Sequence, residues 1–403
     1  MNLIVNMGTT NQEPSIALSN IFNQVCTNFD WYKNMILKSK FYKTRLFTDL
    51  PFINYKILNQ YYYSFSHPNI EGGTCYTTSG TTLGVRKKIF YSATDEKEYI
   101  KQRTEIFKNI IKNENIHTAC ADLGIGHASS SAMTIFETLG LNSKIINHSS
   151  PILEHIRILN KYLPELLFTM PVILDKLIIT GELDIHPKKI VVLGDVISTK
   201  WKEYVASFFN ISTLDITDIY GSIEVGSIAY ECHTCGLYHF SKNIIPEIIS
   251  INNKTGILVI TSVTRSYFPA IRYVTDDVIE DFQKVTCNNT KHFAFKKILG
   301  RNANELKHGE KLSHYEVSET IHNHIPGALY ECYSEGNLII NIYSKHQNKE
   351  VLDFIKSDLK RNNPSLSEMI NAGLVGDIKI SFLNTSDELV QRHKRVFNIF
   401  SNL

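Results

Sequence analysis

The chain has 403 residues, a length that fits a large domain with a smaller one better than a single small domain. Hydrophobic residues make up 43% and charged residues 20%, as in globular proteins, and a net charge of +2 gives no reason to expect a nucleic-acid partner. No apolar run approaches the ~18 residues that span a membrane, and the N-terminus lacks a secretory-signal pattern, so we expect a cytoplasmic protein without a membrane partner.

The first part of the chain alternates short apolar runs with segments of helical periodicity. Residues 1–70 are aromatic-rich and predicted helical, and Ser92 offers an N-cap for a helix over 95–113. The β-branched run KIVVL at 189–193 predicts a buried strand. The other predicted elements are strands over 118–123 and 144–146, and helices over 130–139 and 201–209. This alternation predicts α/β layers around a mostly parallel sheet.

The later part of the chain has a different pattern. Strands are predicted over 237–240, 247–251 and 257–263, with a turn over 252–256. After Gly300 come helices near 315–324 and 348–361 and strands near 337–343 and 377–383. We therefore expect an α/β protein with a large N-terminal domain of mixed β-sheets and helices, residues 1–299, and a small C-terminal α+β lid domain, residues 302–403.

A glycine and hydroxyl cluster lies early in the chain, in the run TTSGTT at 77–82. Ser79, Gly80, Thr81 and Thr82 let backbone N–H groups approach an anion and add hydroxyl donors. This pattern favours a cradle for a phosphate chain, although the Walker spacing is absent. The alternative is an ordinary polar turn between two strands.

The chain has seven cysteines, an odd and scattered set that does not indicate a disulfide framework. Cys232-x-x-Cys235-Gly forms a knuckle-like pattern, His239 follows four residues later, and Cys287 comes further on. This Cys₃His set predicts a closed, structural Zn²⁺ site, and the alternative is a group of reduced thiols beside a surface histidine. The remaining cysteines are predicted to be isolated and buried; they are Cys26, Cys75, Cys120 and Cys332.

Several motifs follow one another in a fixed order along the chain. They are TTSGTT, then Gly-Asp at 194–195, DIYGSIEVG at 218–226, YFPAIRYVTDD at 267–277, LGR at 299–301 and QRHKRV at 391–396. Together they resemble those of the adenylate-forming enzymes, in particular the phenylacetate-CoA ligase-like branch. The resemblance covers nearly the whole chain. It implies the adenylate-forming fold, with a mobile C-terminal lid, and activation of a carboxylic acid by ATP through an acyl-adenylate.

The resemblance implies roles for individual residues. The Ser79–Thr82 loop would hold the β- and γ-phosphates, the Tyr220 ring would contact adenine, and Glu224 would help to hold Mg²⁺. Asp277 would accept both ribose hydroxyls, and Arg301 would pair with phosphate or ribose. The other residues assigned to ATP or AMP binding are Asp195, Gly221 and Ser222.

The resemblance implies a catalytic cation near the C-terminus. The family carries a lysine three residues before an Arg-Val pair, but this position is Arg392 here, and Lys394 lies two residues later. We expect Lys394 to act with Glu224 in catalysis, with Arg392 as the alternative cation. In the family the hinge for rotation of the lid carries an aspartate after the Gly-Arg pair, and this chain has Asn302 there instead.

The pocket for the acid is expected between the segment 124–131 and the Gly-Asp pair, lined by His127, Ser129, Met133 and Gly194. Three functions fit this pattern. The first is an acid–thiol ligase that transfers an aryl or other small acyl group to coenzyme A. The second transfers the acyl group to a carrier-protein phosphopantetheine or to an amine. The third is a nucleotide-binding protein that has lost catalysis.

Overall fold

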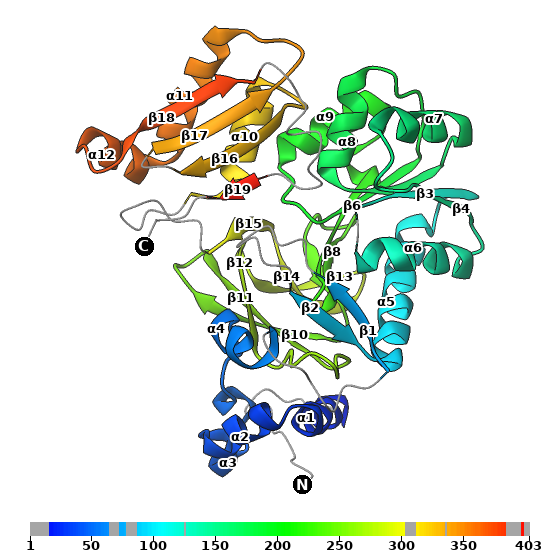
Figure 1. The fold of residues 1–403 in the computed structure, drawn as a ribbon, viewed down its shortest axis with the longest axis vertical. Coiled ribbons are helices and arrows are strands. Elements are labelled where there is room, and N and C mark those ends of the chain that lie inside the picture. Colours follow the sequence, from blue (N-terminus) through cyan, green and yellow to red (C-terminus); the bar gives the residue numbers. More distant parts are fainter. Residues whose placement is uncertain are drawn as a thin grey trace.

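The computed structural model describes residues 16–63, 72–77, 87–124, 126–302, 312–334, 337–383 and 396–398. Figure 1 shows a large N-terminal part, in blue to yellow-green, and a small C-terminal part, in orange to red, which lies beside α8 and α9. The predicted fold class, a mixed α/β protein with a large sheet-rich domain and a small α+β domain, is confirmed. Among the described helices, none has the length and apolar character needed to cross a bilayer.

A nine-stranded sheet forms the centre of the large part. One half is parallel, in the order β7(Ile216–Ser222), β6(Lys189–Leu193), β5(Leu166–Thr169), β3(Thr118–Asp122), β4(Asn142–Ile145). The helices around it are α5(Ala93–Ile111), α6(His127–Thr138), α7(Ile152–Tyr162), α8(Pro171–Thr180) and α9(Thr199–Phe209). The KIVVL strand is found with the predicted bounds, and Ser92 caps α5 as predicted. The structure adds that Asp95 completes a capping box with Ser92.

The other half of this sheet is antiparallel, so the prediction of a mostly parallel sheet holds only as far as β7. The strands that follow are β8(Gly226–Glu231), β9(Tyr238–Phe240), β14(Thr290–Phe295) and β13(Gln283–Cys287). The β7–β8, β8–β9 and β13–β14 connections are too short for a crossover helix, and a short hairpin can join only antiparallel neighbours.

A second, antiparallel sheet lies next to the first. It contains β10(Ile244–Ser250), β11(Thr255–Ser262), β12(Tyr273–Glu280) and β15(Lys297–Arg301). Its core is shared with the N-terminal helices α1(Ile16–Asn28), α2(Asp30–Lys38), α3(Phe41–Thr44) and α4(Tyr55–Leu58) and with the hairpin β1(Thr74–Thr77)–β2(Lys88–Tyr91). Short helical turns occur at Phe47–Asp49, Asn59–Tyr63 and Thr213–Asp215.

The C-terminal part has its own sheet and its own hydrophobic cluster. It contains α10(His314–His324), β16(Leu329–Ser334), β17(Asn337–Tyr343), α11(Lys349–Asn362), α12(Pro364–Asn371), β18(Gly376–Phe382) and β19(Val396–Asn398). The four predicted elements are present, and the sequence interpretation missed β16, α12 and β19. The boundary between residues 299 and 302 stays a prediction.

Helix α10 joins the two parts by packing on α9. The Tyr315 hydroxyl lies 2.7 Å from Thr199 Oγ1, and the Lys200 N–H donates to Glu319 Oε2 at 2.9 Å. Gly327 has a φ of 72°, and a Cβ at this position would lie 2.3 Å from the ring of Tyr204. A residue with a side chain at position 327 would adopt an unfavourable φ and would have to displace the ring of Tyr204.

Candidate active site and metal centre

The predicted phosphate loop connects the strands of the β1–β2 hairpin. Residues 78–86 lie outside the described residues, and so do Ser79, Gly80, Thr81 and Thr82. The ends of the loop are held by the pairing of Thr77 with Lys88. Next to this end, the Lys87 ammonium lies 4.2 Å from the ring centre of Tyr55. Burial lowers the pKa of Lys87, although the nearby Glu224 carboxylate acts in the opposite direction.

Three of the residues predicted to bind ATP form one cluster across the two sheets. Tyr220, at the end of β7, donates its hydroxyl proton to Asp277 Oδ2 at 2.5 Å. Arg301, on β15, places Nε 2.9 Å from the other oxygen of the same carboxylate. Burial and the Asp277 charge raise the pKa of Tyr220, so the phenol stays a proton donor. Each carboxylate oxygen keeps a lone pair for another donor.

The backbone of β12 fixes Asp277 in this position. Asp277 and Arg301 are paired in the β12–β15 register, and the Arg301 Nη1 group donates to the Thr275 carbonyl at 2.9 Å. The Asp277 N–H donates to Thr275 Oγ1 at 3.1 Å. Asp276, between them, has a left-handed φ of 63°, a conformation that aspartate tolerates better than most residues.

Glu224 lies in the tight turn from β7 to β8, and Gly221 lies on β7 just before this turn. A Cβ on Gly221 would lie 2.5 Å from the Gly226 carbonyl oxygen, so only glycine fits there. The Glu224 carbonyl accepts from Arg265 Nε at 3.0 Å, and the buried Arg265 forms an ion pair with Asp95. The half-buried carboxylate of Glu224 makes no hydrogen bond or ion pair with a described residue.

The Gly-Asp pair follows β6, the parallel neighbour of β7. Gly194 has a φ of 91°, and Asp195 Oδ1 accepts from the Val196 N–H at 2.9 Å. Leu193 is paired with Ile219, so the Gly-Asp pair and Tyr220 lie at the same edge of the sheet. The carboxyl edge of parallel strands is the usual position of ligands in such sheets. Ser222, the last residue of β7, accepts a weak hydrogen bond from the Val225 N–H at 3.3 Å.

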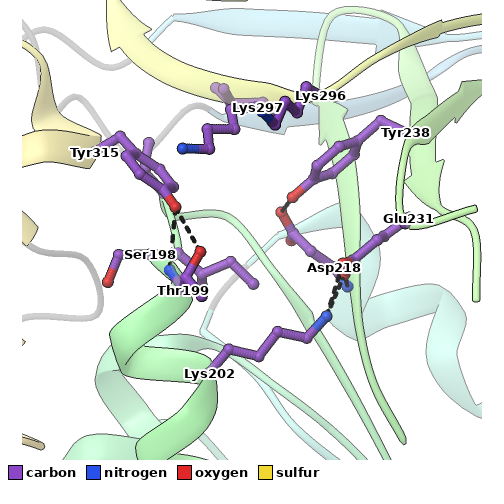
Figure 2. Close-up of a pocket in the computed structure, with 13 residues that line it drawn as sticks. Ser198, Thr199, Lys202, Asp218, Glu231, Tyr238, Lys296, Lys297 and Tyr315 are labelled. Atoms are coloured by element: carbon purple, nitrogen blue, oxygen red, sulfur yellow. Dashed lines mark hydrogen bonds and ion pairs between the residues drawn. The ribbon is translucent and has the colours of Figure 1, made fainter. Parts of the chain in front are cut away.

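A cavity of about 190 Å³ opens beside this edge (Figure 2). It is lined by Val196, Ile197, Ser198, Thr199, Lys202, Asp218, Glu231, Gly236, Tyr238, Lys296, Lys297, Ile298 and Tyr315. The Tyr238 hydroxyl donates to Asp218 at 2.6 Å, and Lys202 pairs with Glu231 at 2.7 Å. Burial raises the pKa of Asp218 to about 7. Tyr315 belongs to α10, so the small domain forms part of the wall.

The predicted acid-pocket residues are only partly brought together. His127, at the start of α6, is buried. Its ring stacks on the Tyr99 ring with 3.8 Å between the ring centres, and its Nε2 lies 2.7 Å from Glu96 Oε2. Ser129 is half-buried. Met133 is 40% exposed, and six residues of helix place it on a different face from His127.

The structure adds a residue that the sequence interpretation missed. Arg103 on α5 is 4% exposed, and its Nη2 lies 3.0 Å from where a Cβ on Gly221 would be. Its Nε and Nη1 have no hydrogen-bond partner. The sequence contained a signal, because Tyr99, Arg103 and Phe107 recur at intervals of four residues on the buried face of the predicted helix.

The four predicted zinc ligands lie together. Their ligand atoms are all within 4.8 Å of one another. Cys232 and Cys287 place their sulfurs 3.7 Å apart, and Cys235 Sγ lies 3.1 Å from His239 Nε2. Two sulfurs bound to one tetrahedral Zn²⁺ at about 2.3 Å would be about 3.8 Å apart, so this donor set fits the ion.

The fold explains how ligands so distant in sequence meet. Cys232 and Cys235 lie in the β8–β9 hairpin, where the Gly236 N–H donates to the Cys232 carbonyl at 2.8 Å. Cys287 ends β13, which reaches β9 through β14. The cluster therefore joins two hairpins. Of the other cysteines, Cys75 is exposed on β1, contrary to the prediction that it is buried, while Cys26, Cys120 and Cys332 are buried as predicted.

Comparisons with known proteins agree with this arrangement. Residues 307–384 match the family described as the fumarate–diaminopropanoate ligase C-terminal domain. The chain is 38% identical over 387 residues to the fumarate–(S)-2,3-diaminopropanoate ligase of Enterobacter agglomerans, which covers 94% of this chain and 97% of that protein.

Two solved structures show the same fold at low sequence identity. A 2-hydroxyisobutyryl-CoA ligase in the postadenylation state aligns with a TM-score of 0.71 and 12% identity, covering 96% of this chain and 88% of that one. An amide bond synthetase from Marinactinospora thermotolerans aligns with a TM-score of 0.52 and 13% identity, covering 80% and 67%. The predicted superfamily is confirmed, and the narrower phenylacetate-CoA ligase-like branch stays a prediction. The chain belongs to the fumarate–diaminopropanoate ligase family of adenylate-forming enzymes.

Proposed function

We propose that this enzyme uses ATP to activate a small dicarboxylic acid and transfers the acyl group to an amine of an amino acid. The observation that carries this proposal is the 38% identity, spread over 94% of the chain, to a ligase named for fumarate and diaminopropanoate. A thiol acceptor, either coenzyme A or a phosphopantetheine, has no comparable support, since the similarity to a CoA ligase is at 12% identity.

The reaction has two steps. In the first, a carboxylate oxygen attacks the α-phosphorus of ATP, pyrophosphate leaves, and an acyl-adenylate forms. In the second, a neutral amine attacks the acyl carbon, AMP leaves, and the amine loses its proton as the amide forms. Both steps need the nucleotide to be held in place while charge develops at the reacting centre.

The described residues have roles in the first step. The free lone pairs of Asp277 accept the ribose hydroxyls, while Tyr220 and Arg301 keep its carboxylate in position. Glu224, without a partner among the described residues, would hold Mg²⁺, which neutralises phosphate charge when bound. The Ser79–Thr82 loop and the cation, Lys394 or Arg392, lie outside the described residues, and their roles stay predictions.

We place the adenine base at the cavity lined by Asp218. Asp218 lies two residues before Tyr220 on β7, and its carboxyl lines the cavity (Figure 2). Adenine presents an exocyclic amino group, which donates hydrogen bonds, whereas hypoxanthine presents a carbonyl oxygen there. The Asp218 carboxyl offers an acceptor oxygen whether or not it is protonated, and an acceptor at this position favours ATP over ITP.

Replacing Asp218 tests this assignment. Asp218→Asn keeps an oxygen for the Tyr238 hydroxyl, so the fold should be retained. We expect the preference for ATP over ITP, as the ratio of kcat/KM in pyrophosphate exchange, to fall by roughly 10-fold. Glu203→Gln, an exposed change on α9, serves as the control. Equal losses with ATP and ITP would show that Asp218 does not contact the base.

The proposed function is tested by ATP–pyrophosphate exchange with a panel of mono- and dicarboxylic acids. The best acid is then offered with (S)-2,3-diaminopropanoate, other amino acids or coenzyme A, and the products are identified by mass spectrometry. We expect exchange with a dicarboxylic acid and an amide product. A thioester formed in preference to an amide would show that the acceptor is coenzyme A and not an amine. Nucleotide binding without exchange would support the non-catalytic alternative.

A further inference from the structure

Arg103 differs from the other buried arginines of the described structure. Arg265 is 2% exposed, and its guanidinium contacts Asp95, the Phe90 carbonyl and the Glu224 carbonyl. Arg272 is 8% exposed and contacts Glu247 and the carbonyls of residues 48 and 50. The fold thus satisfies both of these cations with its own anions and carbonyl groups.

Arg103 has no comparable partner. It is 4% exposed, its Nε and Nη1 make no hydrogen bond, and no described carboxylate pairs with it. Its guanidinium carbon lies 5.5 Å from the centre of the Tyr99 ring. A buried cation without a counter-ion costs several kcal/mol of stability, so a position of this kind indicates that an anion is supplied from outside the chain.

The position of Arg103 shows where that anion would lie. Its Nη2 lies 3.0 Å from the position that a Cβ on Gly221 would take, and Gly221 directly follows Tyr220. Tyr99, one turn earlier on α5, packs against Gly226 at the other end of the same turn. Arg103 therefore lies beside the turn that carries the candidate nucleotide residues Tyr220 and Glu224. An acyl-adenylate bound by these residues is expected to bring its acyl group near this turn.

His127 is not suited to bind an anionic ligand. Its Nδ1 is also buried without a partner, but Nε2 already contacts the Glu96 carboxylate at 2.7 Å. A neutral imidazole that donates through Nε2 presents Nδ1 as an acceptor, which repels a carboxylate. Arg103 is then the group suited to an anionic ligand in this region.

We propose that Arg103 is a specificity-determining residue, which binds the carboxylate of the dicarboxylic acid that does not react. This inference rests on the proposed function and assigns a residue to its substrate preference. The reacting carboxylate loses its charge when it becomes an acyl-adenylate, whereas the second carboxylate keeps its charge throughout. A fixed guanidinium therefore suits the second carboxylate in both steps.

The test compares fumarate with crotonate, in which a methyl group replaces one carboxylate. The kcat/KM of ATP–pyrophosphate exchange is measured for wild type, Arg103→Met, Arg103→Lys and Lys108→Met. Lys108→Met removes an exposed cation from the same helix and is the control. We expect wild type to prefer fumarate by roughly 100-fold. Arg103→Met should lose about 30- to 150-fold with fumarate and less than about 3-fold with crotonate, and Arg103→Lys should lie between.

Three results would overturn the inference. These are a wild type that does not distinguish the two acids, an equal loss with both acids in Arg103→Met, and unchanged fumarate use in Arg103→Met. An equal loss would instead assign Arg103 to the reacting carboxylate or to packing.

A binding measurement separates this inference from the proposed function. If wild type exchanges pyrophosphate with no acid, the proposed function fails. Calorimetric titration of fumarate in the presence of AMP still tests Arg103 in that case. Binding that Arg103→Met abolishes and Lys108→Met retains supports the assignment, and the absence of fumarate binding to wild type, or its retention in Arg103→Met, overturns it.

Discussion

Asp277→Ala is expected to lower kcat/KM for ATP by roughly 1000-fold while acid binding changes little. The substitution removes two hydrogen bonds to the ribose, each worth about 2 kcal/mol when one partner is charged. It also leaves Tyr220 and Arg301 without their common partner. ATP–pyrophosphate exchange at varied ATP and varied acid concentrations measures both effects.

Two further variants make this prediction specific. Asp277→Asn keeps the size of the side chain and one acceptor oxygen, so we expect a smaller loss than in the alanine variant. Asp281→Asn changes a carboxylate in the turn beyond the same strand, where φ is 55° and asparagine is tolerated, and should change activity less than about 3-fold. Unchanged ATP dependence in Asp277→Ala would rule out the ribose role.

Loss of the metal centre is expected to have the largest effect on stability. We propose that Cys232, Cys235, His239 and Cys287 hold one structural Zn²⁺. Because the ion would join the β8–β9 and β13–β14 hairpins, Cys287→Ser or treatment with a chelator should lower Tm by at least roughly 5 °C. Cys75→Ser, which changes an exposed cysteine outside the cluster, should leave Tm unchanged.

Metal analysis completes this experiment. We expect about one zinc per chain in wild type and much less in Cys287→Ser. A wild-type preparation that contains no metal and unfolds at the same temperature after zinc is added would show that the four residues are ordinary thiols and a histidine.

Local sequence patterns predicted the elements that have a single interpretation. The strand at 189–193 has β-branched residues between clear breakers, and the helix after Ser92 has both a cap and an apolar face. Helix α8 was missed because residues 171–178 are all buried, so that the hydrophobic residues of this segment show no helical period. Strand β5 ends just before α8, so that a single apolar run in the sequence contains both a strand and a helix.

The candidate site was predictable where residues cluster in short motifs. Tyr220, Asp277 and Arg301 lie in separate motifs, and the structure brings them into contact. The contact depends on the pairing of β12 with β15 and on the proximity of the two sheets, which no local pattern contains. Arg103 was missed because a cation on a helix is usually solvated, and only burial without a partner distinguishes it.

The wall that Tyr315 contributes to the cavity has a thermodynamic consequence. Its hydroxyl contacts Thr199 at the junction of the two domains, and its side chain lines the cavity. A ligand that fills the cavity and touches this ring stabilises the docked arrangement of the small domain. Because such coupling is reciprocal, separation of the domains weakens the hold on that ligand by the same factor. The affinity for a nucleotide in the cavity and the docking equilibrium of the small domain would then depend on the same interaction free energy. A substitution of Tyr315 would change both quantities.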